Sequence, residues 1–195
     1  TLRKVNAREL WQKILETRMQ TGEPYLVFMD TVNKNMAKHQ KNKGLKVTTS
    51  NLCSEIMLHT GLDHHGKERT AVCCLSSVNL EKWDEWATNE NFIQDVMRFL
   101  DNVLEDFIQN APESMSNAVY SAMRERSVGL GAMGFHSFLQ KKGIPFESAL
   151  AKSWNVKFFK HLKQEADKAS VVLAIEKGAC PDAEEGQVKA RFSHK

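Results

Sequence analysis

The chain has 195 residues, of which 42% are hydrophobic and 26% charged, which is typical of a globular domain with one sizeable core and excludes a disordered or collagen-like chain. Its 27 basic and 24 acidic residues are intermixed, so no basic stripe predicts nucleic-acid binding. No apolar run approaches the roughly 18 residues of a membrane helix, and no charged-then-apolar leader opens the chain, which favours a cytoplasmic location.

In chain order, residues 6–20 predict a first helix, because Asn6 and Glu9 have capping-box spacing and the apolar residues share one face. Gly22 ends it. Residues 25–29 predict a short buried strand, the polar stretch 34–46 a loop, residues 47–58 an extended segment, and residues 70–80 a further strand.

The second half of the chain predicts longer helices. Residues 91–108 predict one helix, and another follows the break at Pro112 as far as about Arg126. Residues 127–133 contain two glycines and predict a strand that another backbone can approach closely. Residues 148–177 predict the last long helix, ended by Gly178. This alternation predicts an α/β fold.

We expect one domain over residues 1–195, incomplete at both ends, because neither end carries an opening or closing signal. The four cysteines are too few and too unevenly spaced for a secreted disulfide scaffold, so reduced and redox-active thiols are expected.

One short motif combines an amide, a thiol and a carboxylate. Asn51, Cys53 and Glu55 occupy alternate positions, so an extended backbone would project all three side chains from one face. Taken alone, the motif is more typical of a strand with a half-polar face turned to solvent.

Several ordered segments give the motif a context. Together they resemble the large, catalytic subunits of ribonucleotide reductases, and the resemblance covers nearly the whole chain. The matching segments are residues 21–25, 50–56, 73–80, 129–131 and 176–181.

The resemblance implies both a fold and a chemistry. The fold would be part of a ten-stranded α/β barrel, with residues 50–56 forming a finger loop that reaches into its middle. Cys53 would become a thiyl radical that abstracts the ribose 3′ hydrogen, Glu55 would take the proton of the 3′ hydroxyl, and Asn51 would bind the sugar together with Leu52 and Leu75. Because a thiol that gives up a hydrogen atom should be neutral, Cys53 is expected to be buried.

The resemblance also implies a redox cysteine pair that is oxidised to a disulfide as the 2′ hydroxyl leaves. Cys73 aligns with one member of this pair, and the other would lie upstream of Thr1. Cys74 departs from the family, which commonly has a polar residue without a thiol there. Adjacent side chains of a strand face opposite sides, so only one of these two cysteines can face the substrate, and Cys73 is favoured.

A zinc site is the competing interpretation of the cysteines. Its ligands would come from His59, His64, His65, Cys73 and Cys74, but their spacings match no familiar pair of zinc ligands, and we expect no metal.

The Asn-Leu-Cys sequence resembles the oxygen-dependent class I enzymes, which implies a ribonucleoside diphosphate substrate. The radical would come from a separate dimetal small subunit and the electrons from a thioredoxin- or glutaredoxin-type reductant, with no cofactor on this chain. Further expected partners are the remainder of the large subunit and a second copy of that subunit. Two alternatives stay open: an adenosylcobalamin-dependent class II reductase, and a noncatalytic interaction fragment of a split subunit.

Overall fold

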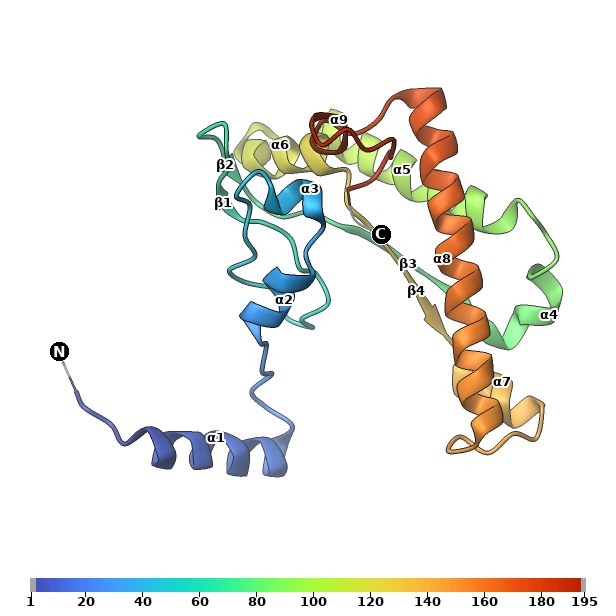
Figure 1. The fold of residues 1–195 in the computed structure, drawn as a ribbon, viewed down its shortest axis with the longest axis horizontal. Coiled ribbons are helices and arrows are strands. Elements are labelled where there is room, and N and C mark those ends of the chain that lie inside the picture. Colours follow the sequence, from blue (N-terminus) through green and yellow to red (C-terminus); the bar gives the residue numbers. More distant parts are fainter. Residues whose placement is uncertain (1–2, 194–195) are drawn as a thin grey trace.

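Two parallel strands form the centre of the structure, a computed structural model that describes residues 3–193 (Figure 1). Strand β3 (Cys74–Asn79) pairs with β4 (Val128–Met133), with Cys74 opposite Val128 and Asn79 opposite Met133. Parallel strands need a long crossover, and the intervening residues supply one. It contains η1 (Leu80–Lys82), α4 (Trp83–Trp86), α5 (Phe92–Asn110), η2 (Glu113–Met115) and α6 (Ser116–Glu125).

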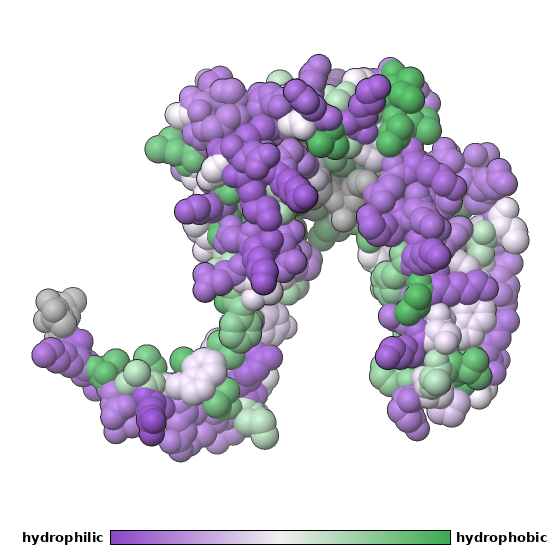
Figure 2. Space-filling model, viewed as in Figure 1, coloured by the Kyte–Doolittle hydropathy of each residue, from purple (hydrophilic) through white to green (hydrophobic). Residues whose placement is uncertain are grey.

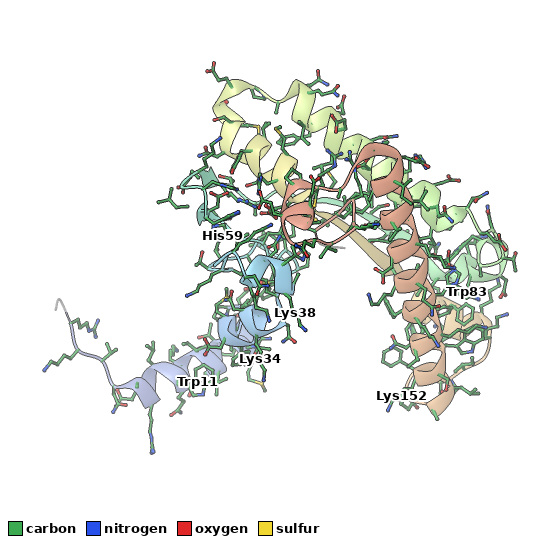
Figure 3. All side chains as sticks on the ribbon, turned by 45° about the horizontal axis from the view of Figure 1, so that its top comes forward. Trp11, Lys34, Lys38, His59, Trp83 and Lys152 are labelled. Carbon is green, nitrogen blue, oxygen red and sulfur yellow. The ribbon has the colours of Figure 1, made fainter. Side chains whose placement is uncertain are left out.

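The hydrophobic core lies between this strand pair and three helices. These are α5, α7 (Phe135–Lys141) and α8 (Ala149–Lys177). Met97, Leu104, Phe138 and Phe158 are fully buried there. Trp83 (labelled in Figure 3) closes one end of the core, with its ring centroid 4.7 Å from that of Phe158. Edge-to-face packing of this kind adds to the stabilisation from buried apolar area.

The chain is shaped like an arch (Figures 1 and 2). Helices α7 and α8 form one leg of the arch, and the N-terminal part forms the other. It comprises α1 (Ala7–Thr21), α2 (Met29–Asn35), α3 (Lys38–Lys41) and the antiparallel strands β1 (Gly61–Leu62) and β2 (Glu68–Arg69), and it meets the C-terminal helix α9 (Pro181–Glu185). Helix α1 has no buried residue, and its apolar side chains gather along one side (Figure 2). None of the described helices is long and apolar enough to cross a membrane.

The sequence predicted the long helices and the two central strands correctly. Asn6 caps α1 by accepting hydrogen bonds from two backbone N–H groups, and Ser148 caps α8. The observed elements confirm the predicted helices 6–20, 91–108 and 148–177 and the strands predicted within 70–80 and 127–133. These elements were predictable because their apolar spacing is local information.

Three predictions for the first 60 residues were wrong in whole or in part. Residues 25–29 form no strand, and Tyr25 and Phe28 are 54% and 71% exposed. A strand needs a pairing partner, and these residues have none within the part of the chain that is described. The expected loop at 34–46 contains the end of α2 and all of α3, and the extended segment 47–58 contains a turn.

Much apolar surface is exposed in this chain. The side chains of Trp11, Met19 and Ile175 are 49%, 88% and 80% exposed, and β3 and β4 pair only with each other among the described residues, which leaves open strand edges. We predict that the isolated 195-residue chain self-associates and melts broadly. Size-exclusion chromatography, a thermal melt and binding of a hydrophobic dye test this. A soluble monomer with a sharp, cooperative melt and no dye binding would contradict it.

Candidate active site

A cleft of about 510 Å³ lies beside the central strands. Glu55 and the three residues after it line one side of the cleft, and Cys73, Leu75 and Ser77 line another. Gly129 of β4 completes the wall, and a Cβ atom there would collide with the Leu75 side chain. Glycine at this position therefore leaves room for the Leu75 side chain of the neighbouring strand, a close approach of the kind that the two glycines predicted.

The segment that carries Cys53 is a turn and not the predicted extended segment. The backbone N–H of Ser54 donates to the Asn51 carbonyl oxygen at 3.0 Å, and the N–H of Ile56 donates to the Asn51 side-chain oxygen at 3.0 Å. The Ser50 hydroxyl also donates to the Ile56 carbonyl oxygen at 2.7 Å. Side chains of Asn and Ser compete in this way for backbone groups that a strand would use, and the alternation of residue types does not reveal this competition.

This turn separates the three residues that were expected to share a face. Glu55 is exposed and lines the cleft, while Asn51 lines a smaller cavity of about 290 Å³ and Cys53 lines neither. Cys53 is exposed, and so is Leu52, at 92%. The expectation of a buried Cys53 is therefore wrong for this chain, because no described segment covers the turn. Of the expected substrate contacts, Leu75 does lie on the cleft.

The two adjacent cysteines, Cys73 directly before β3 and Cys74 at its start, face opposite sides. Cys73 lines the cleft, while Cys74 packs against the hydrophobic core. Burial raises the pKa of the Cys73 thiol to about 12, and the negative charges of Cys74, Glu125 and Glu55 act in the same direction. Burial also raises the pKa of Cys74. Cys73 therefore has the neutral, partly buried thiol that was expected of Cys53.

The five residues considered for zinc do not converge. The ring nitrogens of His59 (Figure 3) lie 2.7 Å and 3.1 Å from the carbonyl oxygens of Lys46 and Leu62. His64 and His65 instead contact Glu185, at 3.1 Å and 3.3 Å. That carboxylate also pairs with Lys43 and Arg124, and two cations so close oppose the binding of a metal ion there.

A buried ion cluster, which the sequence did not predict, centres on Arg69. Arg69 is fully buried, and its guanidinium donates to Asp63 at 2.8 Å, to Asp182 at 2.6 Å and to Glu125 at 3.1 Å. Burial alone would raise the pKa values of Asp63 and Asp182, but hydrogen bonds and neighbouring positive charges, those of Arg69 first among them, together outweigh burial and lower both pKa values. Asp63 lies 6 positions from Arg69, but Glu125 and Asp182 lie 56 and 113 positions away. No local pattern in the sequence could therefore reveal the cluster.

Comparison with known proteins identifies the family. The family model described as "Ribonucleotide reductase, barrel domain" matches residues 1–194. The chain belongs to this family. In this reductase family, the ribonucleoside-diphosphate reductase large subunit of Invertebrate iridescent virus 3 is 45% identical over 190 residues, which make up 97% of this chain and 29% of the relative. The putative large subunit of Frog virus 3 (isolate Goorha) is 49% identical over 181 residues, 91% of this chain and 31% of that one.

A solved structure supports the same assignment. The class Id ribonucleotide reductase alpha subunit of Actinobacillus ureae superposes with a TM-score of 0.87 at 37% identity, over 95% of this chain and 35% of that chain. The expected fold, an α/β part of the reductase barrel, is confirmed. The chain spans about a third of the length of these reductase subunits.

The cluster around Arg69 predicts a local loss of stability when it is broken. Arg69→Met leaves Asp63 and Glu125 buried without a cation and removes one of the three cations of Asp182, and breaking a buried pair in this way costs about 3 to 5 kcal/mol. We expect faster hydrogen exchange at the amides of β1, β2 and α9, measured in a large subunit of full family length that contains this chain. The control is Arg98→Met, which removes an exposed pair with Glu176 and should leave these amides unchanged. Equal effects of the two changes would refute a special role of the cluster.

Proposed function

We propose that this chain supplies the thiol chemistry of a ribonucleoside-diphosphate reductase large subunit. In the proposed reaction, a thiyl radical on Cys53 takes the 3′ hydrogen of the ribose and Glu55 accepts the proton of the 3′ hydroxyl, while Asn51, Leu52 and Leu75 contact the sugar. The 2′ hydroxyl leaves as water. Cys73 and a partner cysteine provide the two reducing electrons and end as a disulfide, and Cys53 returns its hydrogen atom to C3′.

The observation that carries the proposal is the cleft shared by Glu55 and Cys73. A base and a reducing thiol border one space of about 510 Å³, which is within the usual range for small-molecule sites. The high pKa of Cys73 keeps it a neutral thiol, the form that can donate hydrogen. Cys53 lies two residues from Glu55 on an exposed turn, and we propose that the remainder of the large subunit covers this turn.

The similarity to a class Id alpha subunit favours a class I enzyme over the adenosylcobalamin alternative. The proposed partners are accordingly a radical-generating small subunit with a metal pair, a dithiol reductant of the thioredoxin or glutaredoxin type, and a second large subunit. Each of them would act on the complete large subunit.

The orientation of the two cysteines gives a direct test. In a large subunit of full family length containing this chain, Cys73→Ser should abolish turnover with a dithiol reductant, because the disulfide can no longer form. Cys74→Ser is the matched control and should retain most activity, since Cys74 packs against the core. Nucleoside diphosphate reduction and mass spectrometry of the disulfide measure both. Reversed phenotypes would assign the redox role to Cys74.

Glu55 tests the catalytic half of the proposal. Glu55→Gln keeps the size of the side chain but removes its basic oxygen, so turnover should fall by about 10²- to 10⁴-fold, the usual contribution of a positioned base. Glu55→Asp should be intermediate, because it retracts the base by one methylene. Substrate affinity, measured separately by equilibrium binding, should change little. Near wild-type turnover of Glu55→Gln would mean that Glu55 is only a polar residue beside the cleft, and the catalytic role proposed for Asn51, Cys53 and Glu55 would be withdrawn.

A further inference from the structure

A second cavity, of about 450 Å³, lies where the C-terminal ends of α5, α6 and α8 meet, at the top of the arch in Figure 1. It shares no lining residue with the cleft at Glu55 and Cys73. Its wall combines apolar side chains, among them Ile108 and Met123, with four charged ones. The charged residues are Glu105, Arg126, Lys177 and Arg191. A few charged groups on an otherwise apolar concave wall are typical of small-molecule sites.

The three cations of this wall converge on one carboxylate, that of Asp101. Arg126 and Arg191 donate to the same oxygen of Asp101, at 2.7 Å and 2.9 Å, and Lys177 donates to the other oxygen at 2.9 Å. Asp101 is fully buried, and Glu105 adds a second carboxylate, 2.8 Å from Arg126. Burial would raise the pKa values of both carboxyl groups, but hydrogen bonds and neighbouring positive charges together lower them, so both are ionised at neutral pH. Three positive charges therefore face two negative ones.

Several donor groups of these cations have no acceptor, although Arg126 and Arg191 are only 5% and 9% exposed. Nε and Nη1 of Arg191 donate to Asp101 and to two carbonyl oxygens at the end of α8, but its Nη2 donates to no group of the described residues. The Glu105 carboxylate lies 3.9 Å from Nη2, too far for a hydrogen bond. Nη1 of Arg126 donates once and the Lys177 ammonium twice, so each keeps one further N–H. Charged donors that are shielded from water and lack acceptors favour the binding of an anion.

We propose that this cavity is an oxyanion-binding site, which takes a phosphate monoester or a carboxylate carried by a small apolar group. The oxyanion accepts hydrogen bonds from Arg191 and Lys177 and neutralises the excess positive charge, and the apolar group lies against Ile108 and Met123. Ion pairing inside the fold needs only two cations for the two carboxylates, so the third cation is available to a ligand. The site is independent of the proposed thiol chemistry.

The first test measures local protection in a large subunit of full family length that contains this chain. Hydrogen exchange of the amides of residues 177–180 is followed as inorganic phosphate, phenyl phosphate or phenylacetate is added at constant ionic strength, which holds electrostatic screening constant. We expect exchange to slow with concentration, and phenyl phosphate to act at lower concentration than inorganic phosphate because its ring contacts the apolar wall. Phenyl phosphate and phenylacetate carry the same ring, so their comparison distinguishes a phosphate from a carboxylate ligand. Absence of protection by all three probes would overturn the proposal.

Two substitutions in the wall should change the affinity for phenyl phosphate in opposite directions. Arg191→Gln removes the cation with the free nitrogen and should weaken binding about tenfold or more, as expected for a lost hydrogen bond from a charged group. Glu105→Gln keeps the size of the side chain but removes a negative charge beside Arg126 and Arg191, and should strengthen binding about tenfold. The Glu105 side chain is 41% exposed, so this second variant tests the proposal even if Arg191→Gln does not fold.

A matched control separates the cavity from the general charge of the surface. Lys168→Gln removes an exposed cation that pairs with Glu165 on the same helix, nine residues before Lys177 and therefore about 13 Å away along the axis. That separation exceeds the Debye length at physiological ionic strength, so binding should stay unchanged. Unchanged or weaker binding in Glu105→Gln would overturn the proposal, and so would an equal loss in Arg191→Gln and Lys168→Gln.

Discussion

The architecture around the cleft depends on the burial of one guanidinium group. A fully buried arginine is tolerated only when its charge and its hydrogen-bond donors are satisfied, and Arg69 meets this condition through carboxylates at positions 63, 125 and 182. These positions belong to the β1–β2 hairpin, the end of α6 and the start of α9. The N-terminal leg is thereby fixed to the C-terminal part of the chain, and with it the loop that carries Glu55.

The parallel strand pair then determines which thiol reaches the cleft. Cys73 and Cys74 are neighbours in sequence, but the alternation of a strand directs one to the cleft and the other to the core. Gly129 and Gly131 leave the facing wall without side chains, so that Leu75 and Ser77 can occupy the space beside them. The chemical difference between two identical side chains thus arises from backbone geometry and burial.

The sequence predicted those features that depend on local spacing. The periodicity of α1, α5 and α8 was sufficient, and so was the alternation that separates Cys73 from Cys74. The turn at residues 50–56 was not predictable from alternation, because the Asn51 side chain binds a backbone N–H five residues later and replaces the pairing of a strand. The family resemblance supplied a role for Cys53 but not its exposure, which depends on what covers the turn. The Arg69 cluster joins residues 56 and 113 positions apart, and no pattern of one segment encodes it.

The environment of Cys73 imposes a requirement on the proposed redox cycle. A thiol whose pKa is raised to about 12 is a good hydrogen donor, but its thiolate is a poor leaving group, so cleavage of a disulfide at Cys73 must be coupled to proton delivery. The carboxylate on the cleft side, Glu55, is committed to the ribose in the proposed reaction. The proton that the departing sulfur takes must then come from a group other than Glu55 or from solvent.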